Sequence, residues 1–353
     1  MIPREPLPPR GAEALLIDAL PSLASQRCLC LSSGRAQFAL AAAQSWPTSE
    51  VECLYLDLYQ AELARTAIGT LPTNLAIRCE TDFSEQSVDL AALAFSAQGE
   101  ADLVRDLLQS AYERLTLGGV LLAATDNPQD TWLHEQLAKL GGDYERTTSS
   151  QGTCYRGVKR HELKKRKEYS AEVVFRDGER LLRAVTRPGV FSHRRVDPGA
   201  RRLLEQLANE EQFSAASRIV DIGCGWGTVA FAAAARAPAG RVLALDSSTR
   251  AVVCTRDNAA LNQLPNITAQ LSATGEINEP GSYDFVLANP PYYAHFRIAE
   301  LFVTAGHRAL RPGGVLIVVT KSGEWYLERL SDWYEQVERF DARGYTIVRA
   351  VKA

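Results

Sequence analysis

Short apolar runs alternate along the chain with longer stretches whose apolar residues recur at helical spacing. Four runs in the second half, RIVDI, RVLALD, DFVLAN and GVLIVVT, begin at residues 218, 241, 284 and 314 and are predicted to be strands. Two stretches that begin at residues 228 and 297, TVAFAAAARA and RIAELFVTAGHRAL, are predicted to be helices. This alternation indicates an α/β fold with a mostly parallel, doubly wound sheet, which binds ligands at the carboxyl ends of its strands.

One segment of the second half repeats a segment of the first half. Residues 283–321 align on residues 88–126 without a gap, at an offset of 195, and Asp284 falls on Asp89. The Asn-Pro-Pro-Tyr sequence at residues 289–292 has Ala-Phe-Ser-Ala at the matching positions of the first copy. The alignment therefore indicates two similar domains, of which the first lacks these polar and aromatic groups.

A second match lies closer to the start of each copy. At an offset of 189, the run RIVDIGCGWGTVAFAAA from Arg218 falls on LCLSSGRAQFALAAAQS from Leu29, and Asp246 falls on Asp57. Two matches in the same order predict two tandem Rossmann-like, doubly wound domains, the first of them degenerate. The predicted parts are a degenerate domain at 1–155, a basic connector at 156–186 and a complete domain at 187–353.

The net charge of −3 conceals three regions of different sign. Residues 1–155 carry 10 basic and 20 acidic side chains, and residues 203–353 carry 14 and 16. Residues 156–202 carry 15 basic and 6 acidic side chains, a balance of +9, and include the run RGVKRHELKKRKEY. Such a run is either a solvated face or the electrostatic footprint of a polyanion such as a nucleic acid.

Other features of the sequence indicate whether to expect membrane segments, disulfides or metal sites. No run of about 18 apolar residues occurs, so no membrane-spanning helix is expected, and the start MIPREPLPPRGAE lacks the apolar core of a signal peptide. The seven cysteines show no CxxC pair and no zinc-ligand spacing. We expect reduced thiols, no metal site, no membrane partner and a cytoplasmic location. Because the chain contains an internal pair of domains, a monomer is expected.

A glycine-rich turn follows the strand predicted at residues 218–222. It reads Asp221-Ile222-Gly223-Cys224-Gly225-Trp226-Gly227, and its backbone can pass close to a ligand. It does not match the dinucleotide pattern GxGxxG, because residue 228 is Thr. Asp221 suits a ligand with an ammonium group, and Asp246, at the end of the next strand, can accept hydrogen bonds from ribose hydroxyls. S-adenosylmethionine has both an amino-acid end and an adenosine end and fits these two acids.

The Asn-Pro-Pro-Tyr sequence ends a predicted strand, because proline cannot donate to a sheet ladder. The side-chain oxygen of Asn289 and the backbone oxygen of Pro290 are two acceptors that could hold the N–H groups of a planar amine in line with a methyl donor. Tyr292 offers a flat face on which a planar group could stack. A base within a duplex could reach such a pocket only if it were flipped out.

Together these residues resemble class I S-adenosylmethionine-dependent methyltransferases. More narrowly, they are similar to the bacterial ribosomal RNA guanine-N2 methyltransferase family typified by ribosomal RNA small subunit methyltransferase C. The narrower resemblance rests on the degenerate first domain, on Asn-Pro-Pro-Tyr where the family usually has Asn-Pro-Pro-Phe, and on the segment Pro188-Gly189-Val190-Phe191-Ser192 followed by Asp197. It implies methylation of the N2 amine of a guanosine in ribosomal RNA, with the small subunit as the expected source.

The resemblance also implies roles for individual residues. Residues near the methionine end of the cofactor would be Asp221, Gly223, Cys224, Gly225 and Gly227. Asp246 would hold the ribose, and Phe191 would lie beside the cofactor pocket. The family often has an acidic or small polar group near the adenine, and the run LSATGEI offers Ser272 or Thr274 there. The residues at the target amine and base would be Asn289, Pro290 and Tyr292. After the motif, Tyr293-Ala294-His295 stands where many members have His-Asp-Gly.

Other interpretations remain open from the sequence. Similar motifs occur in methyltransferases that modify the glutamine side chain of release factors and in adenine-N6 methyltransferases, because all three substrates are planar amines. A further alternative is an RNA-binding assembly factor without catalysis. The degenerate first domain and the basic connector favour ribosomal RNA or a ribosomal subunit as the partner.

Overall fold

The computed structural model describes residues 9, 11–32, 34–291 and 296–353. The chain divides into two compact units, Met1–Tyr169 and Ser170–Ala353. Residues 156–186 contribute the end of a strand to the first unit and a hairpin to the second. In the part of the chain that is described, no helix is long and apolar enough to cross a membrane.

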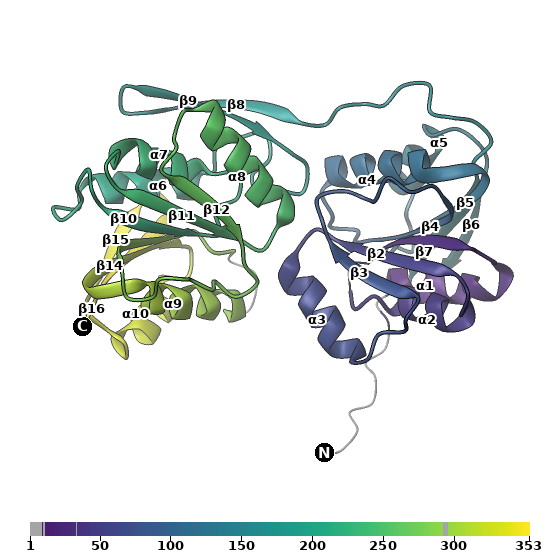
Figure 1. Ribbon diagram of the computed structural model, residues 1–353, viewed down its shortest axis with the longest axis horizontal. Helices are drawn as coiled ribbons and strands as arrows, with labels where there is room; N and C mark the ends of the chain where they lie inside the picture. The colour runs from purple at the N-terminus through teal and green to yellow at the C-terminus, as the bar shows by residue number, and fades with distance from the viewer. Residues whose placement is uncertain (1–8, 10, 33, 292–295) are drawn as a thin grey trace, which may run out of the picture. The chain divides into compact units, whose positions relative to one another are not determined.

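The first unit is a sheet with helices on both faces (Figure 1). Its elements are α1 (Gly11–Ala19), the 3-10 turn η1 (Leu20–Ser22), β1 (Arg27–Leu31), α2 (Gln37–Ser45), β2 (Glu50–Tyr55), α3 (Leu58–Ile68), β3 (Leu75–Cys79), β4 (Val88–Phe95), α4 (Ala101–Arg114), β5 (Leu115–Thr125), α5 (Trp132–Ala138), β6 (Tyr144–Ser149) and β7 (Gly152–Val158). The strand order is β3-β2-β1-β4-β5-β7-β6. Strands β1 to β5 are parallel, and β7 runs antiparallel to both of its neighbours.

The second unit begins with a two-stranded hairpin and continues with a sheet of the same kind (Figure 1). Its elements are β8 (Ala171–Asp177), β9 (Arg180–Thr186), α6 (Pro198–Ala208), β10 (Arg218–Ile222), α7 (Thr228–Arg236), β11 (Arg241–Asp246), α8 (Thr249–Leu261), β12 (Ile267–Leu271), β13 (Tyr283–Ala288), α9 (Arg297–Ala309), β14 (Leu310–Thr320), α10 (Gly323–Ser331), β15 (Tyr334–Ala342) and β16 (Tyr345–Lys352). The strand order is β12-β11-β10-β13-β14-β16-β15.

The two sheets therefore have the same strand order and the same antiparallel last pair. This confirms the predicted fold of two tandem Rossmann-like domains. In each sheet the order reverses between the first and fourth parallel strands, β1 and β4 or β10 and β13. A crevice at the carboxyl ends of these two strands is where doubly wound sheets bind their ligands.

The pairing of β1 and β10 corrects one of the two alignments. Cys28 pairs with Leu90, and Ile219 pairs with Phe285, the residue that matches Leu90 at the offset of 195. The offset in this region is therefore 191, and the expected offset of 189 is wrong by two residues. A shift of two leaves every side chain on the same face of its strand, so the apolar pattern could not reveal the error.

The apolar runs predicted to be strands are buried on both faces of the second sheet. Phe285 and Leu287 of β13 belong to the cluster beneath α6, α7 and α8, whereas Val286 and Ala288 belong to the cluster beneath α9 and α10. Strands that are covered on both faces read as continuous apolar runs instead of alternating ones. The apolar core therefore ends at Asn289, where the chain reaches the carboxyl edge of the sheet.

Two asparagines of α8 hold the hairpin against the second unit. Asn258 accepts a hydrogen bond from the N–H of Val185 (2.7 Å) and donates to the oxygen of the same residue (2.9 Å). Asn262 makes the same two bonds with Arg183 (2.9 and 2.6 Å). The amides thus replace a neighbouring strand for β9. Figure 1 shows α8 beside this hairpin. This attachment fixes the point from which residues 188–193 continue toward the glycine turn.

Candidate active site

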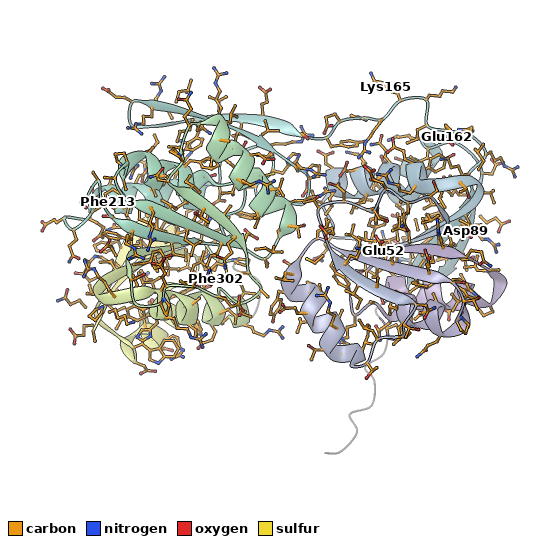
Figure 2. All side chains as sticks on the ribbon, in the orientation of Figure 1. Glu52, Asp89, Glu162, Lys165, Phe213 and Phe302 are labelled. Carbon is orange, nitrogen blue, oxygen red and sulfur yellow. The ribbon has the colours of Figure 1, made fainter. Side chains whose placement is uncertain are left out.

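The glycine turn between β10 and α7 has a backbone that other residues could adopt only with strain. The φ angles of Gly223, Gly225 and Gly227 are 76°, 57° and 100°, all in the left-handed region. A Cβ at Gly223 would lie 2.9 Å from the ring of Phe302, which Figure 2 labels, and a Cβ at Gly227 would collide with the ring of Phe231. Two of the glycines are therefore required by packing as well as by conformation.

The middle glycine is fixed by hydrogen bonds and borders open space. The N–H of Gly225 donates to Asp246 Oδ2 (2.8 Å), and its oxygen accepts a hydrogen bond from the hydroxyl of Thr255 (3.0 Å). Among the described residues, only the backbone oxygen of Phe191, at 3.9 Å, would lie within 4 Å of a Cβ added there. A ligand can therefore approach this backbone closely.

Asp246 lies at the end of β11 and is held by the backbone on both oxygens. Besides Gly225, the N–H of Ser248 donates to its Oδ1 (2.8 Å). The residue is partly exposed, and these two bonds fix the orientation of the carboxylate. A carboxylate oxygen can accept more than one hydrogen bond, so Asp246 is of the residue type that can bind ribose hydroxyls.

Asp221 is a buried carboxyl group with one unsatisfied oxygen. It is 2% exposed, and its Oδ2 has no hydrogen-bond partner among the described residues. Burial raises its pKa to about 7; the hydrogen bond from the N–H of Ala230 partly opposes this rise, and the charge of Asp246 adds to it. An orphaned carboxyl oxygen beside an open glycine turn is suited to a cationic group of a ligand.

Asn289 follows β13 directly, and a second acid orients its side chain. Its Nδ2 donates a hydrogen bond to Asp197 Oδ2 (2.8 Å), and the same oxygen accepts from the N–H of Ala200 (2.9 Å) at the start of α6. Because a carboxylate accepts only N–H or O–H groups, the pairing determines which end of the amide is nitrogen. The acceptor oxygen of Asn289 therefore faces away from Asp197.

The remaining predicted site residues occupy varied positions. Pro290 is buried, whereas Tyr292 and His295 lie outside the described residues. Phe191 is 54% exposed, and its segment is anchored by the buried Arg250, whose Nη1 donates to the oxygen of Pro188 (2.9 Å).

Cys224 is buried within the turn, where its N–H donates to the oxygen of Leu245 (2.9 Å). Burial raises the pKa of its thiol well above the usual value, and the charges of Asp246 and Asp221 add to this rise. The thiol therefore stays protonated, and Cys224 serves the turn as a small packed side chain.

The loop after β12 contains an acid that the sequence reasoning did not select. Glu276 accepts hydrogen bonds from the hydroxyls of Ser272 and Thr274. Burial alone would raise the pKa of Glu276, but these hydrogen bonds and those from backbone N–H groups outweigh it and lower the pKa. The spacing S-x-T-x-E was the available signal. Thr274, predicted to lie near the adenine, is thus engaged by Glu276.

The first unit fills the equivalent positions with its own side chains. At the offset of 191, Tyr55 stands where Asp246 stands in the second unit, and Cys30 stands where Asp221 stands. The hydroxyl of the buried Tyr55 donates to the oxygen of Gly34 (3.1 Å). A phenol therefore replaces the carboxylate that could bind a ribose.

In the first unit, the buried side chain of Glu13 caps the N-terminus of α2. This helix follows the turn that corresponds to the glycine turn of the second unit. Glu13 of α1 accepts hydrogen bonds from the N–H groups of Gln37 (2.7 Å) and Phe38 (3.3 Å), and from the hydroxyl of Ser32. The carboxylate thus satisfies the free donors at the N-terminus of α2. This arrangement favours the prediction that the first domain keeps the fold without the cofactor chemistry.

Asp57, which the predicted alignment matched to Asp246, caps a helix in the first unit. Asp57 corresponds to Ser248 at the corrected offset and not to Asp246. Asp57 accepts a hydrogen bond from the N–H of Gln60 (2.9 Å) and caps α3, as Ser248 caps α8. The predicted match of Asp57 to Asp246 is therefore wrong.

A protein-family model matches the unit that contains the open site. Residues 182–349 match the family described as Methyltransferase small domain. The second half of the chain is thus similar to the methyltransferase small domain family. The matched range includes the glycine turn, Asp246 and Asn289, so the candidate site lies within the residues that match this family.

Two curated relatives are named as ribosomal RNA methyltransferases. Ribosomal RNA small subunit methyltransferase C of Ectopseudomonas mendocina is 34% identical over 145 residues, which are 40% of this chain and 42% of the relative. Ribosomal RNA large subunit methyltransferase G of Streptomyces avermitilis is 38% identical over 173 residues, which are 46% of this chain and 44% of the relative. The chain thus spans less than half the length of these two relatives.

A solved structure matches both units. The 16S ribosomal RNA N2 methyltransferase of T. thermophilus, in complex with AdoMet and guanosine, has a TM-score of 0.80 and 23% identity, covering 96% of this chain and 92% of that chain. At this identity the match shows the shared two-domain fold. The relatives and the fold together confirm the resemblance to the family of ribosomal RNA small subunit methyltransferase C.

The raised pKa of Asp221 predicts a pH-dependent stability. The folded chain binds its proton more tightly than the unfolded chain, whose aspartates have a pKa of 3.8, so folding stability falls as pH rises from about 4 to about 7. The slope from this group is at most about 1.4 kcal/mol per pH unit. Asp221→Asn keeps an acceptor for the N–H of Ala230 and removes the titration. Urea unfolding at several pH values should show the variant gaining stability relative to the natural chain across this window; parallel curves would contradict the assignment.

Proposed function

We propose that the chain transfers the methyl group of S-adenosylmethionine to the exocyclic N2 amine of a guanosine in small-subunit ribosomal RNA. The observation that carries the proposal is the orientation of Asn289. Asp197 binds its nitrogen, and the residue follows β13, which is the strand beside β10 and its glycine turn. An amide oxygen presented at this edge is the acceptor that a planar amine requires.

The residues of the second unit fit the cofactor on structural grounds. Asp221 has an unsatisfied buried oxygen for the ammonium group, and Asp246 is oriented to accept from ribose hydroxyls. Gly223, Gly225 and Gly227 would form the backbone cradle, and Cys224 would lie within it. When bound, the cofactor supplies an electrophilic methyl group on a sulfonium centre.

The chain's own groups would act by positioning the amine. The nitrogen lone pair of a guanine amine is delocalised into the ring, so the amine is a weak nucleophile. Hydrogen bonds from its N–H groups to Asn289 Oδ1 and to the oxygen of Pro290 would favour the pyramidal form and aim the lone pair at the methyl group. Tyr292 would stack on the base. After transfer, the proton of the methylated amine would leave to solvent, since a strong base is not required.

We place this activity in the cytoplasm and propose that the chain acts as a monomer on ribosomal RNA or a ribosomal subunit. A second candidate is a guanosine of the large-subunit RNA. It is favoured by the 38% identity to the large subunit methyltransferase G of Streptomyces avermitilis, which exceeds the 34% identity to the small-subunit relative.

The proposal predicts a specific product. Ribosomal RNA and subunits from a strain that lacks this protein are incubated with the purified chain and labelled S-adenosylmethionine, and the nucleosides are then separated. We expect N2-methylguanosine in the small-subunit RNA and no label with Asn289→Ala, whose cofactor affinity should stay near that of the natural chain. Label in large-subunit RNA would favour the second candidate. Label in N6-methyladenosine, or no RNA label despite cofactor binding, would refute both.

The role of Asp197 can be separated from its role as a helix cap. Asp197→Ser keeps a capping oxygen for α6 but is too short to reach Asn289, whereas Asp197→Ala loses both functions. We expect kcat to fall in both variants, and stability to fall by about 1 kcal/mol only in Asp197→Ala. Thermal unfolding and methyl-transfer rates would be compared. Normal kcat in Asp197→Ser would show that Asn289 is positioned without Asp197.

The basic segment at the end of the first unit contains two kinds of cation. Arg166 forms an ion pair with Glu113 (2.7 Å). The ammonium group of Lys167 lies 5.2 Å from the centroid of the Tyr169 ring. Lys164 and Lys165 are exposed, and Lys165 points away from the ribbon (Figure 2). Lys164 and Lys165 are therefore the better test of RNA binding, because changing Arg166 would also disturb the first unit.

We expect the double variant Lys164→Gln/Lys165→Gln to bind RNA more weakly and with a flatter dependence on salt. Each lost phosphate contact lowers the slope of log K against log salt by about 0.7 to 0.9. The measurement is the RNA dissociation constant over a range of salt concentrations. Lys164→Arg/Lys165→Arg, which keeps both charges, is the control. An unchanged slope in the Gln variant would make the segment a solvated face.

A further inference from the structure

Two aromatic rings stack at the carboxyl edge of the second sheet, at the N-terminal ends of α9 and α10. The ring of Phe296, at the start of α9, lies 4.7 Å from the ring of Trp325 on α10, with 11° between their planes. Phe296 is 41% exposed. The stacked pair is therefore partly accessible to solvent at Phe296.

The ring of Trp325 is held in place by the side chains packed around it. Trp325 packs against the apolar cluster beneath α9 and α10, and the buried Tyr326 contacts it edge to face, with centroids 4.8 Å apart at 89°. A ring fixed in this way loses little freedom when a third ring stacks on the pair. The arrangement differs from a single exposed aromatic side chain, which has no such preset geometry.

The position of the pair connects it to the site. Asn289 follows β13 at Ala288, which pairs with Val318 of β14, and Trp325 follows the end of β14. Phe296 is seven residues after Asn289 in the sequence. Both rings therefore belong to the same edge of the sheet as Asn289. Arg297 follows Phe296 in the sequence, and Lys321 precedes Trp325 by four residues; both are exposed, and the ammonium group of Lys321 lies 5.4 Å from the centroid of the Tyr345 ring. These two cations give the edge positive charge that can attract a polyanion.

We infer that Phe296 and Trp325 form a stacking platform for the base of a nucleotide adjacent to the target in single-stranded or splayed RNA. Every base has a flat face that can stack on an aromatic ring, and sequence-tolerant RNA sites combine such rings with cations. In the proposed function Tyr292 serves the target base, so the platform serves a flanking base. The inference rests on the proposed function for the identity of the RNA, but its binding test does not require methyl transfer.

Phe296→Leu tests the platform because it keeps an apolar side chain and removes the ring. Phe296→Tyr restores a flat face. Phe340→Leu is the matched control, since Phe340 is 40% exposed but has no aromatic neighbour among the described residues. Phe340 also pairs with Ile347, which belongs to the core on the opposite face of the sheet from Trp325.

The readouts are the dissociation constant of a short fluorescent single-stranded RNA, the KM and kcat for ribosomal RNA, cofactor affinity and thermal stability. We expect Phe296→Leu to weaken RNA binding and raise KM roughly tenfold, with kcat and cofactor affinity nearly unchanged. Phe296→Tyr and Phe340→Leu should behave like the natural chain.

Two outcomes would overturn the inference. Equal RNA affinity in Phe296→Leu and Phe340→Leu would exclude a stacking role. Lower stability together with lower cofactor affinity would make the pair a structural support for α9. If the natural chain transfers no methyl group to RNA, the proposed function fails, but RNA affinity lost only in Phe296→Leu would still uphold the platform.

Discussion

The hydrogen bond from the N–H of Gly225 to Asp246 is the interaction on which the second unit's site depends. It ties the turn after β10 to the end of β11, so that a backbone cradle and a carboxylate are held as one rigid group. The turn can make this bond because three glycines adopt left-handed conformations, which cost other residues about 1–2 kcal/mol each. Thr255 holds the same glycine from α8, and the open space beside it remains available to a ligand.

The first unit shows what happens to this turn when its chemistry is lost. Ala36 stands where Gly227 stands and still adopts a left-handed φ of 54°, so the backbone path has survived without the glycine. Tyr55 and Glu13 then occupy the places where a ligand would need a carboxylate and free helix donors. The duplicated sheet keeps its strand order because its apolar core on both faces is intact, and the site can change without affecting that core.

The part of the site that is proposed to bind the amine is assembled from distant parts of the sequence. The asparagines of α8 hold β9, Arg250 holds the segment after it, and that segment leads to Asp197, which orients Asn289. Each step satisfies buried backbone or side-chain groups, so the chain of contacts is also part of the fold. The stacked pair Phe296 and Trp325 lies at the same edge of the sheet.

The sequence by itself determined the fold class, the duplication, and the positions of Asp221, the glycines, Asp246 and Asn289, because strand periodicity and glycine spacing are local signals. It could not determine the register of the first copy, since a slip of two residues preserves the facing of every side chain. Only the tertiary structure showed the hydrogen bond between Asp197 and Asn289, which are far apart in the chain. It also showed that Glu276 accepts a hydrogen bond from the hydroxyl of Ser272. It also decided that Asp221 is buried with an unpaired oxygen, because burial depends on every element packed around β10.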